Sequence, residues 1–413
     1  MSSTTGPATP PTLRSLIPSV FLPAVVYEIG IGAITPVVAI TALDLGASAG
    51  TAGFLVALLG IGQLVGNVPS AAVAARLGDR RAMVVAAGVS VGAVTGCFVA
   101  PSLPLLGVCL LVLGMGNSTF YLARQSYLTE VVPLDLRARA LSMLGGSHRV
   151  GLFIGPFVGA VVISLASLRA AYLVAAVAAA LAAVLLLVIP DVAAAGPARP
   201  ARRTRGGRGY RTMLREHRPL LATLGVAVLA IGAVRAARQV VLPLWAVHIG
   251  LSPEATSLVF GIASAVDMAL FYPSGKVMDR YGRLTVALPS MVVLGLAMAA
   301  LPLTGGIVGL TAVAMVMSLG NGIGSGIVMT LGADAAPPHD RLRFLSIWRL
   351  MSDTGVAVGP VVVSLVAGAW TLAAGIVVVG GVGVLAAGAL ARWAPRYSAF
   401  ATPAMVRARR EAA

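Results

Sequence analysis

The sequence predicts an all-α integral membrane protein, with twelve transmembrane helices arranged as two pseudo-symmetric six-helix halves. Three observations predict this fold class: apolar windows of membrane-spanning length, a repeat at one fixed offset, and basic residues confined to alternate loops. Of the 413 residues, 58% are hydrophobic and 11% are charged. With a mean hydropathy of +0.95, this composition is far from that of a soluble domain and places the chain in a bilayer.

A helix needs about 20 mainly apolar residues to cross the hydrocarbon core of a membrane. In the first half, the windows that meet this condition are 17–42, 49–73, 83–100, 104–130, 140–165 and 170–189. In the second half they are 219–247, 254–274, 284–302, 305–331, 344–369 and 372–391. The chain therefore divides into an N-terminal tail (1–16), a bundle (17–190), a linker (191–218), a second bundle (219–391) and a C-terminal tail (392–413).

The two halves repeat each other at an offset of 204 residues, which carries Gly155-Pro156 onto Gly359-Pro360. The same offset relates further turn and charge positions: Gly116-Asn117 to Gly320-Asn321, Pro133 to Pro337, Arg137 and Arg139 to Arg341 and Arg343, Leu141-Ser142 to Leu345-Ser346, and Arg76 and Gly78 to Arg280 and Gly282. Two homologous halves in a membrane chain indicate a site between them, as in secondary transporters.

The net charge of +16 is explained by where the basic residues lie. Nearly all fall on one side of the predicted topology, in alternate loops, in the tails and in the linker, whereas Arg169 stands alone on the other side. The positive-inside rule predicts a multi-pass protein of the cell membrane with both termini in the cytoplasm. The linker holds eight arginines among Gly, Pro and Ala, so we expect it to be flexible and cytoplasmic. No nucleic-acid partner is needed to explain the charge.

Eight charged residues nevertheless lie inside the predicted spans, away from their end residues: Glu28, Arg124, Arg149, Arg235, Arg238, Asp267, Arg349 and Asp353. Each would cost about 2.5 to 3.5 kcal/mol at a lipid-facing helix centre, so we expect them to face a protein interior or a cavity between the halves. The predicted substrate cavity consists of the five arginines and neighbouring polar residues: Tyr27, Gln63, Asn117, Tyr121, His148 and Asn321. Asn117, Tyr121 and Arg124 share one helical face.

Glu28, Asp267 and Asp353 are the proton-coupling candidates, because a carboxylate near the midplane either pairs with an arginine or exchanges a proton. Structural alternatives stay open for each group. Arg349 can satisfy Asp353 four residues on, Asp267 can pair with Arg235 or Arg238, and Arg124 can pair with Glu130 or extend toward the membrane surface. His148 is more often a packed polar residue than a proton relay.

A second motif is the glycine ridge Gly151, Gly155 and Gly159, which predicts close approach of another helix, with a bend at Pro156. No catalytic residues, metal ligands or cofactor are predicted. Cys97 and Cys109 lack metal-site spacing, and the four histidines are scattered. The expected partners are a small-molecule substrate and the bilayer, with a proton gradient as the driving force and a monomer as the working unit.

With twelve spans, duplicated halves and these motifs, residues 15–395 resemble the major facilitator superfamily. The loop Gly275, Asp279, Arg280, Gly282 and Arg283 is similar to the family's loop signature, and the resemblance implies that its aspartate latches a gate by facing a helix N-terminus of the opposite half.

The first-half copy of that loop keeps Arg76 and Gly78 but has Ala75 in place of the aspartate. The span that contains Gly151 to Gly159 is similar to the family's exporter motif. Leu110 stands about where the family has an arginine early in span 4, so a proton-release role does not transfer to Arg124, which lies later in that span.

These features predict a secondary transporter that works by alternating access, with proton-coupled efflux of a drug-like or metabolite molecule as the leading function. An organic-anion transporter is the alternative, because three acids and five arginines leave the interior with an excess of about two positive charges when all are ionised. An intramembrane enzyme ranks lower because no nucleophile or His/Asp pair is clustered, and an ATP-driven pump lacks its phosphate-binding loop.

Overall fold

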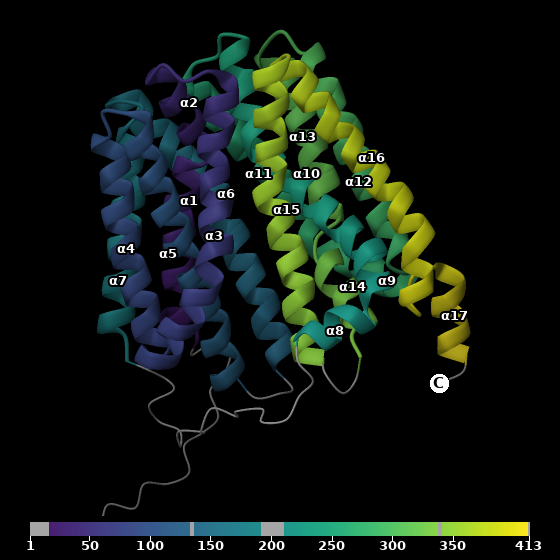
Figure 1. Cartoon of the computed structure of the whole chain (residues 1–413). Coiled ribbons are helices and arrows are strands. Elements are labelled where there is room, and N and C mark those ends of the chain that lie inside the picture. The colour runs from purple at the N-terminus through teal and green to yellow at the C-terminus, as the bar shows by residue number, and fades with distance from the viewer. Residues whose placement is uncertain (1–15, 133–135, 191–209, 338–340, 412–413) are drawn as a thin grey trace, which may run out of the picture.

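The computed structural model describes residues 16–132, 136–190, 210–337 and 341–411. Within these ranges the chain is helical without strands, and twelve helical segments are long and apolar enough to cross a membrane. Figure 1 shows them as two bundles side by side, the first half in purple and blue and the second in teal to yellow. The predicted fold class is confirmed.

The first half consists of six spans. Span 1 is built from three consecutive helices and the other spans from one each: η1 (Ile17–Phe21) with α1 (Leu22–Ile34) and α2 (Val37–Asp44), then α3 (Ala49–Leu77), α4 (Asp79–Val99), α5 (Leu103–Val131), α6 (Arg137–Leu165) and α7 (Ala170–Val188).

The second half begins with the short helix α8 (Tyr210–Glu216) and ends with α17 (Pro403–Glu411). Its spans are α9 (Arg218–Leu220) with η3 (Leu221–Gly225) and α10 (Val226–His248), then α11 (Pro253–Tyr281), α12 (Leu284–Ala300) with η4 (Leu301–Leu303), α13 (Ile307–Ile323) with α14 (Ile327–Ala335), α15 (Arg341–Ala369) and α16 (Leu372–Tyr397). The tenth span is thus broken, at residues 324–326, where Gly326 has a φ of +80°.

The offset of 204 residues recurs in the backbone. Ser48 caps α3 and Ser252 caps α11, each accepting a hydrogen bond from the amide three residues on. Gly78 and Gly282 both have positive φ, of 80° and 97°, at the tight turns that follow these helices. Such backbone is strained for any residue with a Cβ, so these two loop-motif glycines have a conformational role.

Several helices run past their apolar windows, because backbone hydrogen bonding continues where side chains become polar. The eighth span ends at Tyr281 rather than at residue 274, and the twelfth ends at Tyr397 rather than at residue 391. The end of the predicted linker is also helical, and Met213 of α8 is buried. The rest of the linker, 191–209, lies outside the described residues.

Glycines bring helices into close contact inside each half. A Cβ on Gly155 of α6 would lie 2.7 Å from the amide nitrogen of Ala33 in α1, and one on Gly359 of α15 would lie 2.7 Å from Cα of Ala233 in α10. Neither position has room for a side chain. The predicted close approach at the α6 ridge is therefore confirmed, and the repeat reproduces it in the second half.

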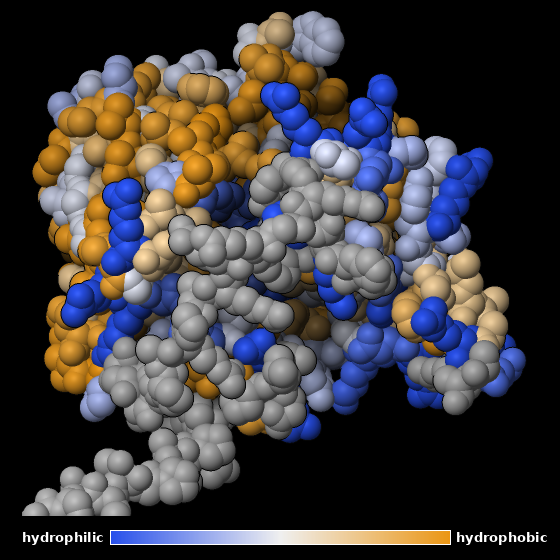
Figure 2. All heavy atoms as spheres, turned by 60° about the horizontal axis from the view of Figure 1, so that its bottom comes forward, coloured by the Kyte–Doolittle hydropathy of each residue, from blue (hydrophilic) through white to orange (hydrophobic). Residues whose placement is uncertain are grey.

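One side of the bundle carries α17 and the arginines Arg76, Arg81, Arg283 and Arg396, and we call it the basic side. It lies at the bottom of Figure 1. Hydrophilic side chains gather on this face in Figure 2, whereas the flank above it is largely hydrophobic. Large apolar side chains cover the flanks, as lipid contact requires: Val188, Val308 and Leu385 are each more than 70% exposed.

The halves meet mainly where α3 packs on α15 and α6 packs on α11. Three contacts between α3 and α15 follow each other toward the basic side: Gly50 with Ser364, Gly60 with Ala357, and Asn67 with Asp353. One helical turn further, Ala71 and Arg349 are exposed. The seam between the halves is therefore packed on the far side and opens toward the basic side.

Candidate functional site

The carboxylate of Glu28 lies in the first half, fully buried and surrounded by side chains from two other spans. Its Oε2 atom accepts a hydrogen bond from the Tyr121 hydroxyl at 3.1 Å and lies 2.9 Å from Nδ1 of His148. Its Oε1 atom lies 3.4 Å from Nη1 of Arg124. Gly151 makes room for this acid, because a Cβ at that position would overlap the Glu28 side chain. The alternative that Arg124 pairs with Glu130 or extends to the membrane surface is wrong.

His148 connects this buried acid to a more open region. The Glu28 side chain is 0% exposed, whereas the His148 side chain is 38% exposed. The imidazole therefore contacts a carboxylate on one edge and remains accessible on another. Sequence reasoning treated His148 as more often a packed residue, but its position beside Glu28 gives it the geometry of a proton relay.

Tyr27 and Asn117 have a different place from the one predicted. The Tyr27 hydroxyl donates to Oδ1 of Asn117 at 2.5 Å and lies 2.7 Å from Oγ of Ser90, while the ring stacks on Phe120. Both residues are almost fully buried, and Ser90 belongs to the peripheral helix α4. They pack the interior of the first half and do not line an open cavity between the halves, because almost no surface of either residue is exposed.

Arg149 and Asp267 join the two halves near the middle of the bundle. Nε of Arg149 on α6 lies 3.8 Å from Oδ2 of Asp267 on α11, and Asn321 donates to Oδ1 of the same carboxylate at 2.8 Å. Arg149 also donates to Oγ of Ser325 at 2.6 Å and stacks over Phe271. The ion pair of Asp267 is thus with Arg149, and the alternative of a pair with Arg235 or Arg238 is wrong.

A second polar link between the halves runs through Asp353. Nδ2 of Asn67 on α3 donates to Oδ2 of Asp353 on α15 at 3.0 Å. Arg349 lies 3.7 Å from Asp353, which confirms the predicted pair four residues apart, and donates to Oε1 of Gln125 in the first half at 2.8 Å. The Arg349 side chain is 49% exposed, so it belongs to the opening of the seam. Gln63 is partly buried on α3.

Arg235 and Arg238 lie on α10 with neutral oxygens as their partners. Arg235 donates to the carbonyl of Gly324, at the break in the tenth span, and Arg238 donates to Oγ of Ser318. Within the described ranges, neither guanidinium has a carboxylate within 4.0 Å. The Nε atoms of both arginines are buried without a hydrogen-bond partner.

A small cavity of about 20 Å³ lies between the halves at this level. Its lining includes Thr35 and Arg149 from the first half and Arg238, Gln239 and Asp267 from the second. That volume is roughly the space of a water molecule. An organic molecule can enter only when the two halves move relative to each other.

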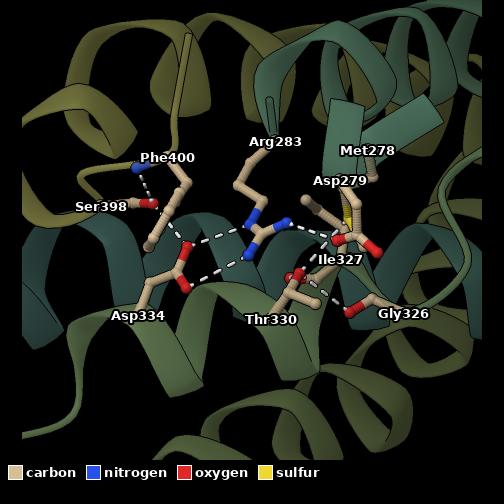
Figure 3. Close-up of polar contacts among 9 residues, drawn as sticks. All are labelled: Met278, Asp279, Arg283, Gly326, Ile327, Thr330, Asp334, Ser398 and Phe400. Carbon is tan, nitrogen blue, oxygen red and sulfur yellow. Dashed lines mark hydrogen bonds and ion pairs between the residues drawn. The ribbon is translucent and has the colours of Figure 1, made fainter. Parts of the chain in front are cut away.

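The loop motif forms a cluster on the basic side, shown in Figure 3 and called here the gate cluster: Asp279, Arg283, Asp334 and Ser398. The Arg283 guanidinium lies 3.0 Å from Oδ2 of Asp334 and 3.1 Å from Oδ1 of Asp279. Ser398 donates to Asp334 at 2.6 Å. Burial lowers the pKa of Arg283, but hydrogen bonds and charge attraction from Asp334 and then Asp279 outweigh it, so the pKa lies above the ordinary arginine value.

The ion pair of Asp279 is formed within its own half, with Arg283 four residues on, and its side chain is 75% exposed. The implied contact with a helix N-terminus of the opposite half stays a prediction, because the pair with Arg283 does not test it. Asp334 was missed by sequence reasoning. The offset of 204 residues could have drawn attention to Asp334. It relates Asp334 to another acid, Glu130, and relates Arg283 to a charged residue, Asp79.

Among the described residues, no cluster of three or more histidine, cysteine or acidic side chains is arranged to hold a metal ion. Twelve spans in two repeated halves, with acids and arginines buried between and within them, define a membrane transporter rather than an enzyme. A sequence model of the Major Facilitator Superfamily matches residues 20–339 and 224–403. The chain belongs to this family.

Known relatives agree with this assignment. The "Uncharacterized MFS-type transporter YhjO" of Bacillus subtilis (strain 168) is 23% identical over 292 residues, which cover 70% of this chain and 71% of that protein. A solved structure of a POT family transporter in complex with a thioalcohol-conjugated peptide has a TM-score of 0.76 at 14% identity, covering 93% of this chain and 96% of that chain. A crystal structure of a mutant of the nucleoside transporter NupG has a TM-score of 0.72 at 13% identity, covering 92% of this chain and 100% of that one.

Proposed function

We propose that this chain is a secondary active transporter that works by alternating access and couples export of a small molecule to proton entry through Glu28. The observation that carries the proposal is the Glu28 site: a fully buried carboxylate that contacts both an arginine and a partly exposed histidine. The basic side is proposed to face the cytoplasm, because arginines concentrate there.

Glu28 suits proton coupling because the groups that compensate its negative charge can rearrange. While it is ionised, Arg124 and His148 compensate its charge in a region without bulk water. Once it is protonated, the attraction to Arg124 is lost and α5 is free to shift relative to α1. His148 supplies the route, because its imidazole can take a proton from the accessible side and pass it to Oε2.

The conformational change is proposed to be a rocking of the two halves. In the described conformation the seam is packed on the far side, where α3 meets α15, and open on the basic side. Closing the basic side would bring the gate cluster toward the first half, and opening the far side would separate Gly50 from Ser364. The cross-half pairs Arg149–Asp267 and Asn67–Asp353 lie between these two ends, where the proposed rotation axis of the halves would pass.

Export is proposed on two grounds. The glycine ridge of α6 resembles the motif of exporters in this family, and in this chain the ridge contacts the proton-coupling acid itself, at Gly151. Tight packing of α6 on α1 therefore fixes the position of Glu28. Changes at the acid are transmitted directly to a helix that also contacts the second half through Arg149.

The test is Glu28→Gln, which keeps the volume and mimics the protonated acid. Purified protein would be reconstituted in vesicles, and movement of a substrate found by thermal-shift screening would be measured with and without a pH gradient. We expect accumulation against a gradient to be lost, while exchange of substrate across the membrane without a proton gradient survives. Glu254→Gln, at the far-side start of α11, is the matched control and should transport like wild type.

The proposal is wrong if the Glu28→Gln protein still accumulates substrate and still loses that activity when the pH gradient is dissipated. In that case another group carries the proton. Asp267→Asn would then be the next variant, because Asp267 is the other acid near the middle of the bundle and its side chain is only 14% exposed.

A further inference from the structure

Three arginines and a single carboxylate form a cluster between and beside the two halves: Arg149, Arg235, Arg238 and Asp267. Arg149, Arg238 and Asp267 line the same cavity, and Arg235 lies one helical turn from Arg238 on α10. Yet the oxygens of Asp267 are already engaged, one by Asn321 and the other by Arg149. The cluster therefore has two positive charges in excess.

No other acid of the described interior balances this excess positive charge. Glu28 is compensated by Arg124 and His148, and Asp353 is compensated by Arg349. The α10 arginines make one hydrogen bond each to a neutral oxygen, and each has a buried Nε without an acceptor. Uncompensated buried cations are unfavourable, so a protein that keeps them has a use for them at a site where an anion binds.

Arg238 is placed to meet such an anion. Its side chain lines the cavity between the halves together with Gln239 and Thr35, which add neutral hydrogen-bonding groups. Arg235 is one helical turn away on the same helix and adds a second positive charge near Arg238. A planar guanidinium binds carboxylate and phosphate oxygens in pairs, with geometry that lysine cannot reproduce.

We infer that Arg238, supported by Arg235, binds an anionic group of the substrate, and that the transported molecule is an organic anion carrying a carboxylate or a phosphate. The inference names the substrate class of the proposed transporter. It rests on the proposed function, because a bound anion is a substrate only if the chain transports it. It also reverses the order of the two transporter hypotheses, because Arg124 compensates Glu28 while the α10 arginines have no acid of their own.

The experiment measures anion binding in detergent, so it needs neither transport nor a proton gradient. Thermal unfolding of the purified full chain would be followed by tryptophan fluorescence during titration with inorganic phosphate or acetate, with chloride at the same ionic strength as reference. Binding to the folded state raises the unfolding temperature by mass action. We expect phosphate and acetate to stabilise the wild type more than chloride does.

The variants locate the site. Arg238→Gln should weaken phosphate binding at least about tenfold, as expected for losing a charged hydrogen-bonding partner, and Arg238→Lys should weaken it less. Without added anion, Arg238→Gln should unfold at the same temperature as wild type or higher, because an uncompensated charge is removed. Arg149→Gln should unfold at a lower temperature, because it leaves Asp267 without its ion pair.

Arg169→Gln is the control, since this arginine lies at the start of α7 and donates to the carbonyl of Phe98. It should keep the phosphate response of the wild type. The inference is overturned if neither anion exceeds chloride on the wild type, or if the response survives in Arg238→Gln. If Arg238→Gln does not fold, Arg238→Lys tests the inference. A phosphate response and affinity in Arg238→Lys equal to those of the wild type would exclude recognition by the guanidinium. Failure of the Glu28 test leaves this result unaffected.

Discussion

At the scale of single residues, one buried acid has partners of two kinds. Arg124 contributes a guanidinium beside Glu28, whereas His148 contributes an imidazole, a group that can both donate and accept a proton. An acid held by arginine alone would be a static pair. The partly exposed histidine adds a contact to Glu28 that is accessible from outside the buried site.

The gate cluster allows a prediction that separates stability from turnover. Asp334 accepts hydrogen bonds from Arg283 and Ser398 and is largely buried, so Asp334→Asn should lower the free energy of unfolding by about 1 to 3 kcal/mol. Asp279 is 75% exposed, so Asp279→Asn should leave stability almost unchanged and reduce transport turnover. Thermal unfolding and vesicle transport at matched protein amounts would check both.

Asp79→Asn is the comparison, since Asp79 stands in the first-half copy of the loop, where Ala75 replaces the motif aspartate. It should reduce turnover less than Asp279→Asn does. Equal and mild effects of the two variants on turnover would remove the gate role of Asp279.

The sequence identified the buried charges but could not assign their partners. A charge inside a span is costly where it faces lipid, so Glu28, Asp267 and the arginines could be predicted to face the protein interior or a cavity. Partner choice depends on helix rotation and packing. Arg124 lies 96 positions along the chain from Glu28, and Arg149 pairs with an acid in the other half. The i and i+4 pair of Arg349 and Asp353 was predictable, because it lies on a single helix.

At the scale of helices, glycine spacing sets which pairs pack closely. Gly151 and Gly155 allow α6 to pack closely on α1. Gly355 and Gly359 allow α15 to pack closely on α10, at positions related by the repeat. The spacing of four residues and the offset of 204 made these contacts predictable. The break in the tenth span was not predictable in the same way, because Gly324 and Gly326 lie within an apolar window that continues on both sides.

Two alanine substitutions on α6 test this packing with a control in the same helix. Gly155→Ala would place a Cβ against the backbone of Gly32 and Ala33, so it should lower the free energy of unfolding by about 1 to 3 kcal/mol. Gly146→Ala meets no atom within 4 Å and should be neutral or slightly stabilising, because alanine favours helix more than glycine does. Thermal unfolding in detergent would measure both, and equal stability of the two variants would contradict the packing role.

At the scale of the whole molecule, the charge asymmetry and the open seam occur on the same side. Arginines mark the basic side, and the contacts between α3 and α15 end before they reach it. If the basic side is cytoplasmic, the described conformation faces inward, where an exporter collects its substrate. The orientation in the membrane thus decides whether the described conformation faces the cytoplasm or the exterior.

Single cysteines at two described positions test that orientation. Gly305, in the far-side turn before α13, has open space around it, and Glu411 is exposed at the end of α17 on the basic side. The native thiols Cys97 and Cys109 are buried and should react little. In intact cells, a membrane-impermeant thiol reagent should label Gly305→Cys but not Glu411→Cys, which should react only after the membrane is permeabilised. The reverse pattern would place the basic side outside, and the seam would then open toward the exterior, against the proposed direction of substrate loading.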